Sequence, residues 1–206
     1  MAFDFLIDGE ADAPTKIVLA HGAELPMDSP WMSQFAEGLA SAGFAVVRFE
    51  FPYMRARRIE GRRKAPDRRH VLMDHWRAVI DEVGPPGRLV IGGKSMGGRI
   101  ASMVADAAQV KGLVCLGYPF HPPGKPERTR TAHLEALRTP TLIVQGTRDS
   151  MGKPDDVAGY TLSNRIEILW MEAGDHGFKP TKASGRTPEQ AMSEAIAAVA
   201  AFAAAL

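Results

Sequence analysis

The chain has 206 residues, 45% of them hydrophobic, and a formal net charge of +1. This size suits one domain around a single core, which we expect to span residues 1–206. No apolar run reaches the roughly 18 residues of a membrane span, and the first residues lack the basic start of a secretion signal. The single Cys115 excludes an internal disulfide. We therefore expect a cytoplasmic protein.

Short apolar, β-branched runs alternate with helical apolar stripes along the chain. In chain order we expect an antiparallel edge strand at 3–7, a strand at 16–20, a helix after Ser29-Pro30, a strand at 44–51, a helix from Leu72 to Val83, a strand at 88–91, a helix from Met96 to Ala107, strands at 110–116, 141–144 and 165–171, and a helix to Leu206 after a capping box at Thr187.

Apolar strands separated by helices belong in a sheet that is covered on both faces. The fold class is therefore α/β: a doubly wound, mostly parallel sheet with helices on both faces. In such sheets ligands bind beyond the carboxyl ends of the strands, so a residue that follows a strand is a candidate site residue.

The segment Gly93-Lys94-Ser95-Met96-Gly97 matches the pattern G-x-S-x-G. It directly follows the predicted strand at 88–91 and precedes the helical stripe that begins at Met96. Small flanking residues allow a sharp strand-to-helix turn that exposes a serine hydroxyl as a nucleophile. The alternative is a glycine-rich turn with an idle serine.

A serine nucleophile needs N–H donors that stabilise the oxyanion formed during the reaction. The backbone N–H of Met96, at the start of the helix, is one candidate. His21-Gly22-Ala23 follows the strand at 16–20, and we nominate the Ala23 N–H as the second donor, with Gly22 as the alternative. His21 itself is expected to brace this loop rather than transfer protons.

The general base is expected after the last strand, because hydrolases with this serine turn order the triad as serine, acid, histidine. His176 follows the predicted strand at 165–171, and His121 is the one rival that also follows a strand. The acid must lie between Ser95 and His176 and after a strand, which Asp149 does.

Three other carboxylates compete for the role of the acid. Asp155 and Asp156 lie next to Pro154 and are typical of a helix N-terminus. Asp175 adjoins the histidine in sequence and would need an awkward turn to reach its ring. The sequence thus predicts Ser95, His176 and Asp149 as nucleophile, base and acid.

Four motifs together resemble a known family: 92–99 around the serine, Gly117-Tyr118-Pro119-Phe120-His121 with the residues to 126, Gln145-Gly146-Thr147-Arg148-Asp149, and Gly174-Asp175-His176. They resemble the α/β-hydrolase-like family related to dienelactone hydrolases, which includes testis-expressed protein thirty and a subunit of the NSL histone acetyltransferase complex. The resemblance runs from His21 to the final helix. It implies the α/β-hydrolase fold and the three triad positions, but no particular substrate.

Residues 52–69 hold eight Lys or Arg against two acids. We expect a surface loop beside the catalytic mouth; the sharper hypothesis is that some of its arginines bind an anionic substrate group. About twenty residues separate Phe120 from Thr141, which leaves no room for a lid domain. We assign substrate contacts to His121, Tyr118, Lys94 and Arg55.

The sequence therefore predicts a serine hydrolase, and among such enzymes it favours a carboxylesterase for small or short-acyl esters. The alternatives are a thioesterase or peptidase with the same triad, or a noncatalytic interaction module. We expect no cofactor and no metal, since the histidines and acids lack ligand spacing. The expected partner is a small-molecule substrate, with an anionic one as the sharper hypothesis, and neither nucleic acid nor membrane. The sequence leaves the oligomeric state open.

Overall fold

A computed structural model describes residues 3–10 and 12–206. Its centre is a seven-stranded sheet in the order β1-β3-β2-β4-β5-β6-β7. The strands are β1 (Leu6–Asp8), β2 (Lys16–Ala20), β3 (Ala45–Phe49), β4 (Leu89–Lys94), β5 (Gly112–Leu116), β6 (Thr141–Gly146) and β7 (Ile166–Met171). Among these described strands, only β1, at one edge, pairs in the antiparallel sense. The predicted doubly wound α/β fold is confirmed, with strand ends shifted by at most three residues.

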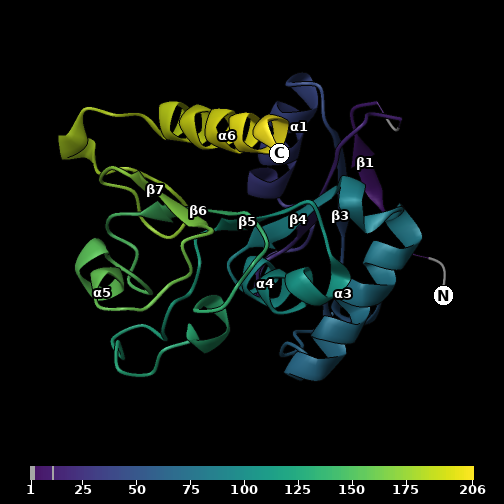
Figure 1. The fold of residues 1–206 in the computed structure, drawn as a ribbon, viewed down its shortest axis with the longest axis horizontal. Coiled ribbons are helices and arrows are strands. Elements are labelled where there is room, and N and C mark those ends of the chain that lie inside the picture. Colours follow the sequence, from purple (N-terminus) through teal and green to yellow (C-terminus); the bar gives the residue numbers. More distant parts are fainter. Residues whose placement is uncertain (1–2, 11) are drawn as a thin grey trace.

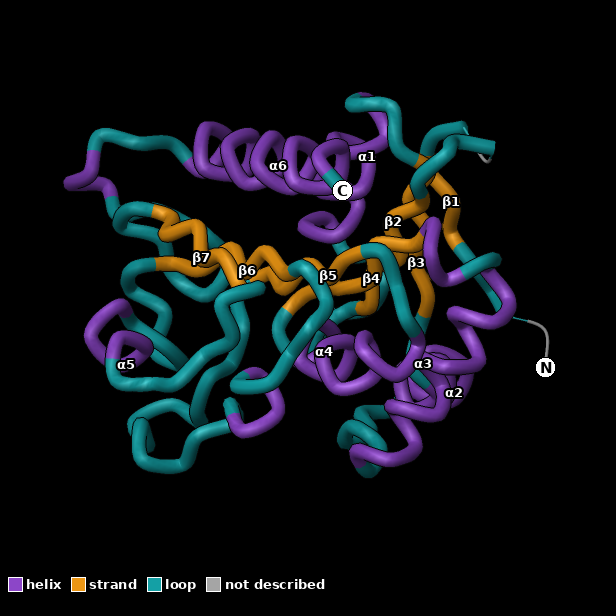
Figure 2. The backbone as a smooth tube through the Cα atoms, viewed as in Figure 1, coloured by secondary structure: helices purple, strands orange, loops and turns teal. Residues whose placement is uncertain are grey.

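Helices cover both faces of the sheet. They are α1 (Pro30–Ser41), α2 (Pro52–Glu60), α3 (Arg69–Val83), α4 (Met96–Ala108), α5 (Pro154–Ala158) and α6 (Pro188–Ala205). Figure 1 shows α1 and α6 on one face and α3 and α4 on the other, and Figure 2 shows α2 beside α3. Among the described residues, no helix combines the length and the apolar character needed to cross a bilayer.

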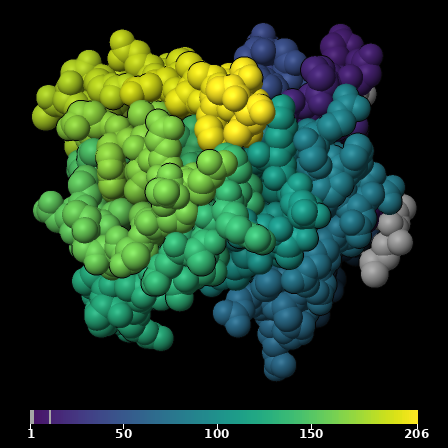
Figure 3. Space-filling view, in the orientation of Figure 1, coloured from purple at the N-terminus to yellow at the C-terminus, as the bar shows by residue number. Residues whose placement is uncertain are grey.

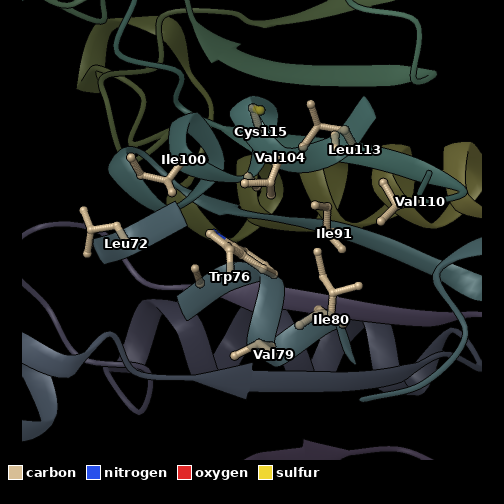
Figure 4. Packing of buried hydrophobic residues seen from close by; sticks show 14 of the residues in the cluster. Leu72, Trp76, Val79, Ile80, Ile91, Ile100, Val104, Val110, Leu113 and Cys115 are labelled. Atoms are coloured by element: carbon tan, nitrogen blue, oxygen red, sulfur yellow. The ribbon is translucent and has the colours of Figure 1, made fainter. Parts of the chain in front are cut away.

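Alternation of side chains along the strands builds two cores, one on each face. Val18, for example, pairs with Val47 and Ile91 in the neighbouring strands and faces α3 and α4. Figure 4 shows Trp76 from α3 directed toward Ile91, Ile100 and Val104 of β4 and α4. Phe35 of α1 and Val199 of α6 belong to the core on the opposite face. Burial on both faces explains why these strands are apolar throughout.

One helix departs from the expectations, and another agrees with them. Residues 52–60 form α2 rather than a loop, because Pro52 occupies the first turn and Gly61 ends the helix in the left-handed conformation, with φ 66°. Tyr53 and Met54 on this helix are buried, which a charge count did not reveal. Helix α5 is short and begins at Pro154, so Asp155 and Asp156 do lie in the first turn of a helix.

Candidate active site

Ser95 lies in the turn between β4 and α4, with φ 51° and ψ −115°. A side-chain-bearing residue adopts such a positive φ only at a cost of roughly 1–3 kcal/mol, and such strain clusters at functional sites. The flanking glycines permit this turn: a Cβ on Gly93 would lie 2.1 Å from the Ala20 oxygen, and one on Gly97 would lie 2.5 Å from the same atom. The glycines of the motif thus allow the serine turn to pack directly on the end of β2.

The imidazole of His176 and the carboxylate of Asp149 form a hydrogen-bonded pair. His176 Nδ1 lies 2.6 Å from Asp149 Oδ2, although the two residues are 27 positions apart. Asp149 is completely buried, and its carboxylate also accepts hydrogen bonds from Gln145 Nε2 and the Met151 N–H. Because Nδ1 donates to a carboxylate, Nε2 of His176 is left as a proton acceptor.

Gln145 was not singled out from the sequence. Its side-chain amide donates to Asp149 Oδ2 at 2.9 Å and to the Gly152 oxygen at 3.2 Å, so it fixes both the acid and the loop after it. The available signal was its place at the end of β6, four residues before Asp149.

The serine turn and the imidazole flank the same strand end. The Ser95 N–H donates to the Leu116 oxygen at 2.9 Å. A Cβ on the next residue, Gly117, would lie 3.2 Å from His176 Cε1. Among the described residues, no hydrogen bond joins the Ser95 hydroxyl to His176 itself. The structure thus links His176 to Asp149 directly, and to Ser95 through the end of β5.

The loop at Gly22 and Ala23 borders the serine. A Cβ on Gly22 would lie 3.8 Å from Ser95 Cβ. The Tyr53 hydroxyl donates to the Gly22 and Ala23 oxygens at 3.2 and 3.0 Å. In a trans peptide the N–H points opposite to the preceding C=O, so the Ala23 N–H is directed away from Tyr53. No backbone partner is found for the Ala23 or Met96 N–H among the described residues.

His21 fixes the conformation of this loop through two hydrogen bonds. Its Nε2 accepts a hydrogen bond from the Phe51 N–H, so Nδ1 carries the proton and donates to the Gly22 oxygen at 2.6 Å. Burial lowers the pKa of His21 to about 4, which keeps the ring neutral near pH 7. These contacts agree with a bracing role for His21.

A pocket of about 330 Å³ opens at Ser95. We call it the Ser95 pocket; it is lined by Ala23, Pro66, Asp67, Arg69, Leu72, Ser95, Met96, Arg99, Ile100, Pro119, Arg130 and Met151. Its walls thus come from the loop after β2, the residues just before α3, the starts of α3 and α4, and the loops after β5 and β6. Figure 3 shows the surface indented at its lower edge, between the blue and the teal parts of the chain.

None of the four residues assigned to substrate contacts lines the Ser95 pocket. Lys94 points toward the rings of Trp31 and Phe178 and donates to the His176 oxygen, because successive side chains of β4 alternate between the faces of the sheet. Tyr118 is buried, and its hydroxyl donates to the Arg130 oxygen at 2.9 Å.

The other two residues of that group are also held elsewhere. His121 is buried, with Nδ1 2.8 Å from the Pro122 oxygen and Nε2 3.4 Å from Asp156 Oδ2. Arg55 forms an ion pair with Asp4 and lines a different cavity. The pocket at Ser95 is therefore lined by other side chains.

Most of the basic stretch 52–69 is neutralised by acids. Arg58 pairs with Asp28 and Glu50, and Arg63 pairs with Glu24. Arg62 and Lys64 both pair with Glu60. Of the cations in this stretch, Arg69 is the one that lines the Ser95 pocket.

A larger cavity of about 830 Å³ lies among α2, α3 and the residues at 3–4. It shares no lining residue with the Ser95 pocket and contains no serine, cysteine or threonine among its lining residues. Size alone therefore does not mark the reactive site. Among the described residues, no cluster of three His, Cys, Asp or Glu side chains is arranged to hold a metal ion.

A second serine–histidine contact joins Ser102 Oγ to His133 Nε2 at 2.8 Å. Ser102 lies in the interior of α4, is buried, and also donates to the Arg99 oxygen at 2.7 Å. It does not line the Ser95 pocket. This contact joins α4 to the short helical turn Ala132–Leu134, and Ser102 does not lie in a strand-to-helix turn as Ser95 does.

The mostly parallel sheet, with a sharp serine turn between β4 and α4, is typical of the α/β-hydrolase fold. The chain belongs to the alpha/beta hydrolase domain family, whose sequence profile matches residues 13–204.

Solved structures share this fold over nearly the whole chain. A serine hydrolase without lid from Xanthomonas campestris is 21% identical with a TM-score of 0.67, and the match covers 98% of this chain and 88% of that one. A dienelactone hydrolase from Anabaena variabilis is 21% identical with a TM-score of 0.69, and the match covers 96% of this chain and 88% of that one. A monoacylglycerol lipase from Paleococcus ferrophilus is 16% identical with a TM-score of 0.70, and the match covers 99% of each chain. At these identities the likeness concerns the fold alone.

Proposed function

We propose that this protein is a serine hydrolase in which Ser95 is the nucleophile, His176 the general base and Asp149 the acid that orients it. The observation that carries the proposal is the 2.6 Å bond between His176 and the buried Asp149, beside the end of β5 that also holds the strained serine turn. A buried carboxylate that fixes the tautomer of a histidine is the arrangement that activates a serine hydroxyl.

In the proposed reaction, His176 Nε2 removes the hydroxyl proton as Ser95 Oγ attacks the carbonyl carbon of an ester. The oxyanion accepts hydrogen bonds from the N–H groups of Met96 and Ala23, with Gly22 as the alternative donor. His176 then protonates the leaving alcohol, which gives an acyl-enzyme. A water molecule, deprotonated by His176, attacks the acyl carbon and releases the acid.

The substrate we propose is a small or short-acyl carboxylic ester. The loop from Gly117 to Pro140, between β5 and β6, contains only a single short helical turn, so nothing in it forms a lid. The Ser95 pocket, at about 330 Å³, lies at the lower end of ligand-pocket sizes. A thioester or peptide bond could use the same groups, and a noncatalytic interaction module is the alternative of another class.

The finer assignments rest on the sequence. The narrower kinship with the family of testis-expressed protein thirty and the NSL complex subunit comes from the four motifs around Ser95, Tyr118, Asp149 and His176. The buried, unpaired Cys115 supports a cytoplasmic location, since it needs no oxidising compartment.

The test is labelling with a fluorophosphonate, which reacts with activated serines, combined with turnover of a short-chain p-nitrophenyl ester. We expect Ser95 to be labelled, and Ser95→Ala to lose the label and to lower kcat by about 10⁶. The matched control is Ser102→Ala, which removes the other serine hydroxyl bonded to a histidine and should still be labelled. Labelling that survives Ser95→Ala, or a folded wild-type protein that is neither labelled nor active, would overturn the proposal.

A further inference from the structure

Three arginines meet in the Ser95 pocket from three separate parts of the chain. Arg69 is the first residue of α3, Arg99 lies in the first turn of α4, and Arg130 belongs to the loop between β5 and β6. Sequence spacing did not predict this meeting, and only Arg69 belongs to the basic stretch 52–69. The pocket that opens at the nucleophile therefore carries a concentrated positive charge.

Two of these arginines are held in place by backbone contacts near the serine. The Arg99 N–H donates to the Ser95 oxygen at 3.0 Å, so the backbone of Arg99 lies one helical turn after the nucleophile. The Arg130 N–H donates to the Phe120 oxygen at 2.7 Å, and the Arg130 oxygen accepts from the buried Tyr118 hydroxyl. The backbone at Arg99 and Arg130 is thus fixed before any ligand binds.

Within the part of the chain that the structure describes, the three guanidinium groups lack protein partners. Among the described residues, no side-chain hydrogen bond or ion pair reaches the guanidinium of Arg69, Arg99 or Arg130, whereas Arg55 and Arg58 outside the pocket are both paired with acids. The Nε of Arg99 is buried and has no hydrogen-bond acceptor within the described chain. A buried donor without an acceptor destabilises the folded protein, more so when the group is charged, so a ligand oxygen at this point would relieve that cost.

The surroundings of the three arginines add to the positive charge in the pocket. Burial and the charges of Arg130 and Arg69 hold the pKa of Arg99 below its ordinary value, although an arginine stays charged near pH 7. Helix α3 has no acidic residue in its first turn, so its N-terminal dipole adds partial positive charge beside Arg69. The one carboxylate in the pocket lining is Asp67, and its Oδ2 already accepts from the Tyr53 N–H.

We infer that the substrate carries an oxyanion, a carboxylate or a phosphate, which Arg69, Arg99 and Arg130 bind while the ester bond lies at Ser95. This inference rests on the proposed hydrolase function and adds the substrate class. Guanidinium groups match both oxyanions in geometry and form charge-assisted hydrogen bonds with them. The apolar side chains of Leu72, Ile100 and Met151 line the same pocket and suit a short hydrocarbon spacer.

The first experiment compares two matched esters: the p-nitrophenyl monoester of glutaric acid, which is anionic, and its methyl-capped neutral analogue. We expect the wild-type protein to favour the anionic ester in kcat/KM, and Arg130→Gln to lower that value roughly 10- to 100-fold for the anionic ester alone. Arg69→Gln should act in the same direction. The matched control Arg55→Gln removes a paired arginine outside the pocket and should leave the ratio unchanged.

The second experiment measures binding without turnover, by titrating glutarate and inorganic phosphate separately into the Ser95→Ala protein in a calorimeter. Binding of glutarate identifies a carboxylate site and binding of phosphate a phosphate site; either should weaken at least tenfold in Ser95→Ala/Arg130→Gln. Equal rates for the two esters, unaffected by these arginines, together with no oxyanion binding, would overturn the inference while the hydrolase function stands. A protein that binds the oxyanion but hydrolyses neither ester would refute the proposed function instead.

Discussion

The ammonium of Lys94 donates a hydrogen bond to the backbone oxygen of His176 at 2.5 Å, across 82 positions of the chain. Lys94 directly precedes Ser95, so the strand that carries the serine is tied to the loop that carries the imidazole. The same ammonium lies 5.5 Å from the ring centre of Trp31 and 5.7 Å from that of Phe178. Burial lowers the pKa of Lys94 to about 8. We interpret Lys94 as a positioning residue rather than a substrate contact.

Lys94→Met tests this interpretation, because it keeps most of the apolar packing and removes the donor. We expect kcat to fall roughly 10- to 100-fold with little change in KM, since a displaced imidazole impairs proton transfer but not binding. The control is Lys111→Met, which removes a lysine whose ammonium donates to Thr15 Oγ1 at the opposite end of the strands, just before β5 and β2 begin. A Lys94→Met protein with wild-type kcat would refute the positioning role.

Asp149→Asn tests the assignment of the acid. The NH2 group of an asparagine cannot accept hydrogen bonds, so in place of Oδ2 it loses the bonds from His176 and Gln145, and in place of Oδ1 it loses the bond from the Met151 N–H. We expect a folded protein with kcat lower by about 10⁴, as happens when a triad histidine loses its orienting carboxylate.

The matched control for that variant is Asp175→Asn. The Oδ1 of Asp175 accepts from the Gly177 and Lys179 N–H groups, which an asparagine oxygen can also do. We expect Asp175→Asn to keep kcat within about tenfold of wild type, because removing charge from a surface loop that stays in place costs little. If Asp175→Asn abolished turnover and Asp149→Asn did not, the two acids would have to exchange roles.

Gly97→Ala tests the close packing of the serine turn. The added Cβ would lie 2.5 Å from the Ala20 oxygen and 2.6 Å from the His21 oxygen, and backbone atoms cannot move aside cheaply. We expect the free energy of unfolding to fall by about 1–3 kcal/mol, as in other overpacked sites, and activity to be lost. Chemical denaturation measures the first and ester turnover the second.

Gly87→Ala is the matched control, since a Cβ added there would meet no atom within 4 Å and the φ of Gly87 is not positive. Its stability should be unchanged or raised by up to about 1 kcal/mol, because alanine restricts the unfolded chain. A Gly97→Ala protein as stable and active as Gly87→Ala would contradict the described contact.

Burial of His21 makes stability depend on pH. The unfolded imidazole binds a proton near its ordinary pKa of 6.5, whereas the folded one does so only near 4. Between these values the unfolded state binds more protons, so the free energy of unfolding decreases as the pH falls, by at most about 3 kcal/mol from this group. The lowered pKa of His133, also about 4, acts in the same direction.

Urea unfolding between pH 4.5 and 7.5 measures this decrease, and the NMR titration of the His21 ring assigns it. A folded-state pKa near 6.5 for His21, or stability that is flat over this range, would contradict the description of the ring as a buried, neutral brace.

Local patterns predicted most of the fold and the positions of the candidate triad. The G-x-S-x-G segment between an apolar strand and a helical stripe placed Ser95 in the turn where the structure has it. His176 and Asp149 were found by their places after β7 and β6, and the structure brings those two side chains together. Helix α2 was missed because eight basic residues between 52 and 69 are typical of a solvated loop, and the charge count hid the buried Tyr53 and Met54.

The sequence by itself determined the features that depend on residues near one another in the chain. These are the alternation of strands and helices, the sharp turn at Ser95, and the end of the strands at which the candidate reactive groups lie. What only the tertiary structure decided is which distant side chains meet. Lys94 donates to the His176 oxygen and does not line the Ser95 pocket, and Arg55 forms an ion pair with Asp4. Three arginines, without partners among the described residues, line that pocket together: Arg69, Arg99 and Arg130. A charge count sums residues along the chain, whereas pairing and burial depend on distances that the packing of the sheet and helices sets.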